Sequence, residues 1–357
     1  MNLTQSESLA ADIGCVASTD WTGLIRRGDI DAVVVATPHK YLAQISAAAL
    51  EERKHVLCEK PGARTSAEAE AMLRVLYDGW QTADTPLFPR ITKRGATKLV
   101  IGFTLRHHRS IARAREILMR GEIGKPMYLI GRYGHGGRPG YEQEWRHVPE
   151  LAGGGELLDQ GVHLIDLSRW FLGEFAEVAG FVGNYFWGPR DAAGKGGLED
   201  NAFLLLRSAE GQVASLQASW TQWKNLFSFE VYGENGFVQA QGLGGSYGAE
   251  KLMVGHRRAQ GGAPDIQEID LRAGPKEESQ DDVWAIEWQA FVNEVLEQDN
   301  PENHNPAIKP ASAIDAWEAL RIVEAAYAAS RTASAVPLVQ PATRHYDKAF
   351  TAAQRAD

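Results

Sequence analysis

Short β-branched runs that alternate with helical patterns most constrain what the first third of this chain can fold into. Each of the first two runs, IDAVVVAT and HVLCEK, is apolar at its centre and ends at a proline, Pro38 or Pro61. A run of this kind is typical of a buried parallel strand followed by a turn. Strands are expected at 30–37, 55–61 and 98–103, with helices at 41–52 and 66–77 between them. Strands that alternate with helices predict a parallel sheet, whose ligands lie beyond the carboxyl ends of the strands.

After Arg106 the pattern changes to one helix and then mostly strands with alternating apolar residues, which is typical of an antiparallel sheet with one buried face. We therefore expect an α+β second part with a large open, mostly antiparallel sheet. Its strands are expected at 127–134, 177–187, 202–208, 212–223, 227–242 and 250–255, and its helices at 111–120, 155–172, 281–297 and 311–329. Apolar side chains of the last two helices are interpreted as packing residues: Trp284, Trp288, Phe291, Ile314, Leu320 and Val323.

A chain of 357 residues is too long for one ordinary core, so two domains are expected. The expected bounds are 1–105 for an incomplete Rossmann-like domain and 106–340 for an α+β domain, followed by a polar tail at 341–357. The stretch 78–97 holds two prolines and little periodicity, so it is expected to be an exposed loop.

Composition excludes several classes of function. A formal net charge of −9 leaves no basic stripe for a nucleic acid, and no apolar run is long enough to span a membrane. The amino-terminal residues lack a basic start and an apolar signal core, so a cytoplasmic protein is expected. Cys15 and Cys58 are too few for a disulfide framework and are expected to be reduced.

Lys60 stands directly after the second expected strand, where a ligand would lie. A partly buried ammonium group there can donate to a substrate hydroxyl. The alternative is a surface lysine in a turn. Thr37 and Phe103 end the neighbouring strands at the same edge.

Asp159 and His163 are four residues apart in GGGELLDQGVHLID, which places both on one face of a helix. A carboxylate beside an imidazole can act as an acid–base unit, although a solvated pair or a helix cap has the same spacing. The three glycines at 153–155 permit a close backbone approach at a helix start that faces a ligand, or else form a flexible loop.

The remaining polar candidates follow the first sheet: Arg106, Tyr133, Trp145, Arg146 and Lys224. Each on its own could equally be a surface or core residue. The adjacent His107 and His108 would point apart and could not chelate one metal together, so no metal site is predicted.

Taken in order, IDAVVVATP, HVLCEKP, KLVIGF, GEIGKP and GGGELLDQGVHLIDLSRWFLG resemble the motifs of the Gfo/Idh/MocA oxidoreductases over about residues 15–335. The resemblance implies a dinucleotide-binding domain, a substrate-binding and oligomerisation domain, and hydride transfer from a secondary alcohol of a sugar, inositol or sugar derivative to NAD or NADP. It implies a catalytic trio of Lys60, Asp159 and His163. The cofactor residues it implies are Thr37, Pro38, Glu59, Lys60 and Arg106, and the substrate residues are Lys60, Tyr133, Trp145, Arg146, Asp159 and His163. A carbohydrate or polyol substrate and a homo-oligomer, a dimer or tetramer, are the expected partners, with no nucleic acid and no membrane.

The chain departs from the family pattern at its start, because the sequence holds no GxGxxG turn to cradle a pyrophosphate. Leu42 also stands near the place where many members have a histidine, and His39 lies a little earlier. Three explanations are considered: a chain begun at an internal methionine, a truncated gene, or a native loss. A sheet without its first strands would expose an apolar edge. Two alternative functions stay open. One is a non-catalytic carbohydrate-binding or regulatory subunit that has lost the cofactor site, and the other is an NAD-using glycosidase on the same fold.

Overall fold

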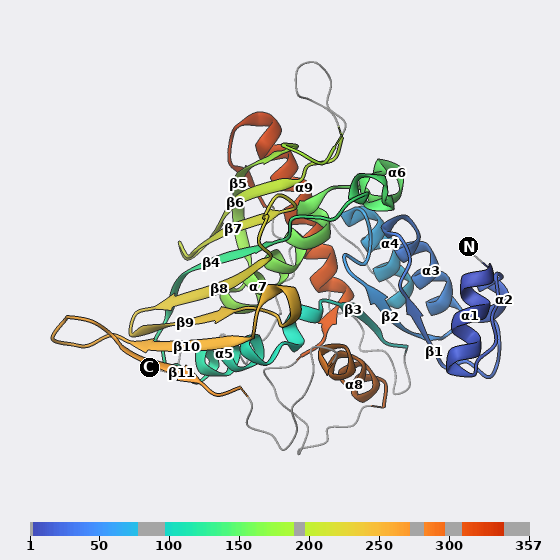
Figure 1. Cartoon of the computed structure of the whole chain (residues 1–357), viewed down its shortest axis with the longest axis horizontal. Helices are drawn as coiled ribbons and strands as arrows, with labels where there is room; N and C mark the ends of the chain where they lie inside the picture. Colours follow the sequence, from blue (N-terminus) through green and yellow to red (C-terminus); the bar gives the residue numbers. More distant parts are fainter. Residues whose placement is uncertain (1–2, 78–96, 189–196, 272–281, 297–308, 339–357) are drawn as a thin grey trace.

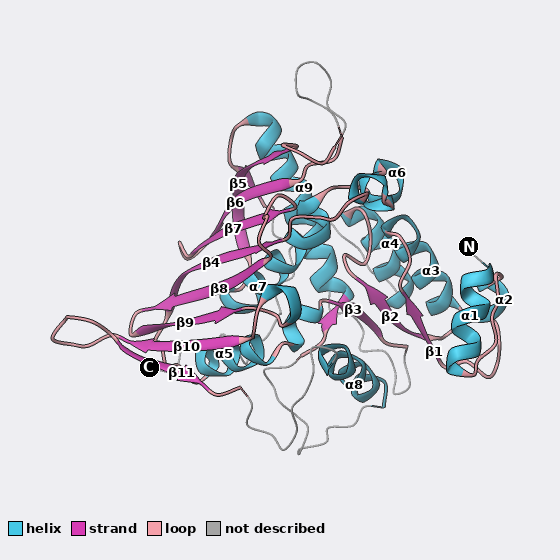
Figure 2. Ribbon diagram, in the orientation of Figure 1, coloured by secondary structure: helices cyan, strands magenta, loops and turns pink. Residues whose placement is uncertain are grey.

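The computed structural model describes residues 3–77, 97–188, 197–271, 282–296 and 309–338. These residues form one four-stranded sheet and one nine-stranded sheet, with helices around and between them (Figures 1 and 2). The expected mixed fold, a parallel Rossmann-like sheet beside a large open sheet, is confirmed. The loop expected at 78–97 lies outside the described residues except for residue 97. The tail expected at 341–357 lies wholly outside them.

The first sheet has the strand order β1-β2-β3-β12. Its first three strands run parallel, and β12 pairs antiparallel with β3. The strands are β1 (Ala32–Val35), β2 (His55–Glu59), β3 (Leu99–Gly102) and β12 (Ala311–Ser312), and the helices after β1 and β2 are α3 (His39–Glu51) and α4 (Ser66–Leu76). Both proline-ended runs thus form the strands expected of them.

Two short helices precede β1: α1 (Leu3–Ile13) and α2 (Trp21–Ile25). Neither was expected from the sequence. Among the described residues β1 pairs only with β2, which makes it an edge strand. Val34 of this strand is 53% exposed, whereas Val35 is buried in the core.

The second sheet has the order β11-β10-β9-β8-β4-β7-β6-β5-β13. Its neighbours are antiparallel except for β4 and β7, which are parallel. The strands are β4 (Pro126–Gly134), β5 (Phe175–Gly183), β6 (Asn201–Ser208), β7 (Val213–Ser219), β8 (Leu226–Gly233), β9 (Gly236–Gln241), β10 (Lys251–His256), β11 (Asp265–Ile269) and β13 (Val336–Pro337). The sequence did not predict β11, β12 or β13, and the last two are only two residues long.

Helices cover one face of the second sheet: α5 (Arg109–Met119), α7 (Val162–Leu172) and α9 (Ala313–Thr332) (Figure 1). The burial of β6 alternates, so that Phe203, Leu205 and Arg207 point away from these helices. Phe181 of β5 pairs with Phe203 on this outer face, and its side chain is 63% exposed. An open apolar sheet face of this kind is typical of an interaction surface.

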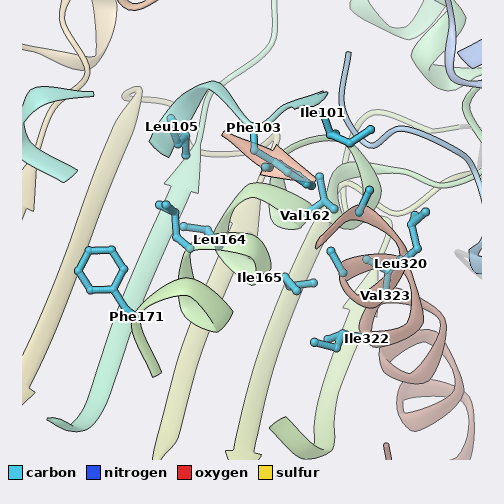
Figure 3. Packing of buried hydrophobic residues seen from close by; sticks show 14 of the residues in the cluster. Ile101, Phe103, Leu105, Val162, Leu164, Ile165, Phe171, Leu320, Ile322 and Val323 are labelled. Carbon is cyan, nitrogen blue, oxygen red and sulfur yellow. The ribbon is translucent and has the colours of Figure 1, made fainter. Parts of the chain in front are cut away.

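One apolar core joins the two sheets. Side chains from the end of β3, from α7 and from α9 lie together in Figure 3, and the labelled ones are all buried: Ile101, Phe103, Leu105, Val162, Leu164, Ile165, Phe171, Leu320, Ile322 and Val323. Burying each such side chain contributes about 1.5–3 kcal/mol relative to leaving it exposed. The core therefore fixes the end of β3 against the first turns of α7.

The start of α9 ties the sheets together by polar contacts as well. Ser312 and Asp315 form a capping box at its amino terminus. The Asp315 carboxylate also lies 3.4 Å from the Arg106 guanidinium and 3.5 Å from that of Arg169. The strand β12 immediately before this helix belongs to the first sheet, whereas α9 itself packs on β5 of the second.

Helix α8 (Asp282–Leu296) corrects one packing expectation. Phe291 is buried against Leu57 and Val100 of the first sheet, as expected. Trp284 and Trp288 are instead 54% and 45% exposed, because their shared face points away from that sheet.

Candidate active site

Lys60 and Asp159 meet where the first sheet faces the second part of the chain. Lys60 follows β2, and its Nζ donates to Asp159 Oδ1 at 2.5 Å and to the Asp159 main-chain oxygen at 2.7 Å. The lysine side chain is 16% exposed and the aspartate side chain 7%. Two of the three predicted catalytic residues are therefore in direct contact.

Asp159 lies in η4 (Leu157–Gly161), a π-helical segment that leads into α7. Such segments are rare and often occur at functional sites, because the widened turn redirects side chains. Glu199 fixes its start, since one carboxylate oxygen accepts the main-chain N–H groups of Gly155 and Leu157 and the hydroxyl of Tyr327.

The three glycines before η4 allow the close backbone approach and positive φ expected of them, and the close approach is to protein atoms. A Cβ atom at Gly154 would lie 2.4 Å from the Tyr327 hydroxyl, and one at Gly155 would lie 1.9 Å from the Glu199 main-chain oxygen. Gly153 ends α6 (Pro149–Ala152) with a φ of +81°. Protein atoms therefore fill the space that the missing side chains leave.

Two further nitrogen-bearing side chains surround the Asp159 carboxylate. Arg146, from η3 (Trp145–His147), donates its Nε to Asp159 Oδ2 at 3.1 Å. The Nε2 atom of His39 lies 3.8 Å from Asp159 Oδ1. Burial raises the pKa of the Asp159 carboxyl, but the charges of Lys60 and Arg146 outweigh this and hold the pKa below its usual range. Asp159 is therefore ionised at neutral pH.

His39 was not among the predicted site residues. It is the first residue of α3, 3% exposed, and Trp145 packs edge-on against its ring with the centroids 4.8 Å apart. The available signal was its position one residue after Pro38, at the carboxyl end of β1. A histidine at such a strand end points toward the ligand edge of a parallel sheet.

His163 lies on the first turn of α7 between two aromatic rings. Its ring centroid is 5.7 Å from that of Phe103 and 6.1 Å from that of Tyr133. Its Nδ1 is buried without a hydrogen-bond partner among the described residues, and no hydrogen bond joins it to Asp159 there. Burial, and then the charge of Lys60, lower the pKa of His163 to about 3, so the ring is neutral at physiological pH. The expected carboxylate–imidazole pair is thus replaced by a carboxylate–ammonium pair beside a free imidazole.

The predicted cofactor residues divide into two groups. Thr37, Pro38 and Glu59 lie with Lys60 at the carboxyl ends of β1 and β2. Arg106 does not present its guanidinium to this edge, because it is 3% exposed and donates to both oxygens of Asp166 at 2.7 and 2.5 Å. We therefore correct its expected role to that of a buried structural ion pair.

The residues present fit the nicotinamide end of a dinucleotide better than its pyrophosphate. The Thr37 hydroxyl oxygen is buried and has no partner among the described residues, which leaves a polar group for a ligand. The glycine-rich turn that would bind a pyrophosphate does not occur in the sequence.

The other candidates lie apart from these contacts. Lys224 is exposed. His108 bonds Glu250 at 2.6 Å while His107 lies 4.0 Å from Glu287, so these two histidines do point to different partners. Within the described ranges, no cluster of three or more His, Cys, Asp and Glu side chains could hold a metal ion.

Two family models match the chain. One, described as the oxidoreductase family with an NAD-binding Rossmann fold, covers residues 1–78, and the other, the GFO/IDH/MocA C-terminal domain, covers residues 111–239. The chain belongs to the Gfo/Idh/MocA oxidoreductase family. The family that the motifs suggested from the sequence is therefore confirmed.

Curated members of the Gfo/Idh/MocA family resemble parts of the chain. The levoglucosan dehydrogenase of Pseudarthrobacter phenanthrenivorans is 30% identical over 242 residues, which cover 62% of this chain and 58% of that protein. The inositol 2-dehydrogenase 2 of Saccharopolyspora erythraea is 29% identical over 205 residues, 57% of this chain and 52% of that protein. The matched stretch thus spans little more than half the length of these relatives.

Solved structures of the family share the fold. Levoglucosan dehydrogenase in complex with NADH and levoglucosan superposes with a TM-score of 0.75 at 22% identity, over 95% of this chain and 88% of that one. An oxidoreductase domain protein from Kribbella flavida gives a TM-score of 0.76 at 24% identity, over 95% and 89% of the two chains.

None of the helices in the described residues has the length and apolar character that crossing a membrane requires.

Proposed function

We propose that the chain is an NAD(P)-dependent oxidoreductase that removes a hydride from a secondary alcohol of a sugar, inositol or sugar derivative. One observation carries the proposal: the largely buried Lys60–Asp159 ion pair lies beside a neutral imidazole, His163, whose Nδ1 has no hydrogen-bond partner in the part of the chain that the structure describes. The names of the two curated relatives, a levoglucosan and an inositol dehydrogenase, support the same class of substrate.

Three side chains divide the chemistry. The substrate hydroxyl accepts a hydrogen bond from the Lys60 ammonium group, which stabilises negative charge as the hydroxyl proton leaves. Neutral His163 accepts that proton. Asp159 holds Lys60 in place through the 2.5 Å contact.

The cofactor would lie against Thr37, Pro38 and Glu59 at the strand ends. A bound nicotinamide supplies the hydride acceptor, while the protein supplies orientation and charge. The ring of Tyr133 lies next to His163, and that of Trp145 lies next to His39. Their rings would exclude water from the reacting carbon.

The test has two stages. Calorimetric titration with NAD, NADH, NADP and NADPH measures cofactor binding. Absorbance of the reduced nicotinamide is then followed with levoglucosan and myo-inositol as substrates, with a His163→Gln variant as the matched control. Saturable binding followed by NADH or NADPH formation supports the proposal. Sugar binding without any cofactor binding would instead favour the non-catalytic subunit, and glycoside cleavage without net NADH would favour the glycosidase.

A further inference from the structure

His39 links the two segments that build the candidate active site. Its ring lies between the Ala152 carbonyl group, at the end of α6, and the Asp159 carboxylate in η4. It is 3% exposed, although it begins a helix whose next residue, Lys40, is exposed. A buried imidazole in this place has no role in the mechanism above.

The partner of Nδ1 decides where the proton of the ring lies. Nδ1 is 2.9 Å from the Ala152 main-chain oxygen, and a carbonyl oxygen can only accept. The Nδ1 atom therefore carries the hydrogen and donates it. In a neutral ring the Nε2 atom is then an unprotonated acceptor.

The surroundings keep the ring neutral. Burial first, and then the positive charge of Lys60, lower the pKa of His39 to about 4, against the opposing influence of Asp159 and the Ala152 carbonyl. Arg146 adds a smaller effect in the same direction as Lys60. At neutral pH the Nε2 lone pair thus lies 3.8 Å from a carboxylate oxygen that cannot donate to it. That oxygen accepts from Lys60, so Nε2 is the acceptor that still needs a donor.

We propose that Nε2 of His39 accepts a hydrogen bond from a second substrate hydroxyl adjacent to the reacting one, so that the preferred substrates are vicinal diols. This inference rests on the proposed oxidoreductase function and narrows its substrate class. Within the described residues the ring makes one hydrogen bond, through Nδ1, which leaves Nε2 available to a ligand.

The distances suit a hydroxyl group. A substrate hydroxyl oxygen about 2.8 Å from Nε2 is at an ordinary hydrogen-bond length from that atom. The second hydroxyl donates its one proton to Nε2, while Lys60 donates to the two Asp159 oxygens and to the reacting hydroxyl. A methyl or methylene group in this position would leave Nε2 unsatisfied, whereas Asp159 Oδ1 already accepts from Lys60.

The state of the ring is tested first, in the protein without ligand. Nitrogen-15 spectra of histidine-labelled protein, with the His39 signals assigned by comparison with a His39→Asn variant, report which nitrogen carries a proton. We expect a protonated Nδ1 and a bare Nε2 throughout the neutral pH range. A ring protonated on both nitrogens, or on Nε2 alone, would overturn the inference.

Two variants then separate substrate binding from support of the Ala152 carbonyl. The amide nitrogen of asparagine can replace Nδ1 as the donor to Ala152 but has no atom at the position of Nε2, whereas the glutamine amide reaches that position with an acceptor oxygen. We expect His39→Asn to raise the KM and the dissociation constant for levoglucosan or myo-inositol about ten-fold with little change in kcat, and His39→Gln to restore most of the binding. An exposed histidine, His256, provides the control variant His256→Gln.

The outcomes distinguish this inference from the function on which it rests. If wild-type protein binds neither sugar, the carbohydrate activity itself is rejected. If wild-type protein binds one and His39→Asn binds it equally well, the role of His39 is rejected and the oxidoreductase proposal stands. If His39→Asn keeps the affinity and His39→Gln loses it, the ring serves only to hold Ala152.

Discussion

The Lys60 ammonium group lies 2.5 Å from Asp159 Oδ1, across 99 positions of sequence, and its second bond is to the main-chain oxygen of the same aspartate. The two hydrogen bonds from Lys60 to Asp159 therefore fix the position of η4 relative to the end of β2. Any shift of either segment would break a buried, charge-assisted contact.

Replacing Asp159 with asparagine should impair both activity and stability. The variant keeps the shape of the side chain but leaves the largely buried Lys60 without its counter-ion, at a cost of up to about 3–5 kcal/mol in the free energy of unfolding. We expect kcat to fall by about 10²-fold or more because Lys60 is no longer held. Urea unfolding and steady-state kinetics measure the two effects. A matched control is Asp29→Asn, whose carboxylate pairs with Arg27 on the surface.

Replacing His163 with alanine should depress turnover while leaving the protein folded. Loss of the proton acceptor is expected to lower kcat by about 10²–10⁴-fold. Circular dichroism should match the wild type, because the ring is neutral and its Nδ1 makes no hydrogen bond in the described residues. Wild-type turnover in this variant would remove His163 from the mechanism.

Buried histidines should make the protein acid-labile. Burial, the first cause in each case, lowers the pKa of His107 to about 3 and that of His39 to about 4, from an ordinary value of 6.5. Because the folded pKa lies below the unfolded one, their stabilisation is fully present above pH 6.5 and is lost as the pH falls toward 4 and then 3. Urea midpoints measured at intervals from pH 7 to pH 4 test this. The decline should be shallower in His107→Phe and unchanged in His256→Phe.

Glu287 should act in the opposite direction. Burial, followed by the nearby charge of Glu59, raises its pKa from 4.5 to about 8, while the Thr104 hydroxyl donates to it at 3.2 Å. A raised folded pKa gives stability that is present below pH 4.5 and lost as the pH rises through 8. Glu287→Gln cannot ionise, so we expect it to match wild type at acid pH and to exceed it at pH about 9 by a few kcal/mol. Equal unfolding free energies of the two proteins at alkaline pH would contradict this.

The outer face of the second sheet should hold copies of the chain together. Phe203 and Leu205 project from β6 with exposed fractions of 39% and 54%, on the face without helices. We expect Leu205→Lys to convert a dimer or tetramer to smaller species, because a charge in an apolar interface is costly. Light scattering after size-exclusion chromatography measures this. Arg207→Lys, on the same face, is the control, and an unchanged mass for Leu205→Lys would exclude the face.

Much of the fold could be predicted because its signals are local. The run AVVV in β1 and the helical spacing of α3 depend only on neighbouring residues. Strands such as β12 could not be found in this way, because two residues carry no period. β12 exists because Ala311 and Ser312 pair with Ile101 and Val100, which lie more than two hundred positions earlier.

The residues of the candidate site likewise differ in whether local sequence could predict them. Lys60 was predictable because a residue directly after a parallel strand lies at the ligand edge. The role of Arg106 was not, because nothing near it in sequence indicates that Asp166 and Asp315 enclose its guanidinium. His39 was missed for a related reason: its contact with Asp159 depends on how α3 approaches η4, 120 positions away in the chain.

The pairing of β12 with β3 has a consequence for biosynthesis. A growing chain can form β1, β2 and β3 early, but β3 stays without its outer neighbour until residues 311–312 have left the ribosome. The ion pairs of Asp315 with Arg106 and Arg169 likewise cannot form until residue 315 has left the ribosome. Contacts of such long sequence separation close late, because the entropy of the intervening loop must be lost first. Chains that stop before residue 311 are therefore expected to be substrates for chaperones and proteases, even though they already contain both Lys60 and Asp159.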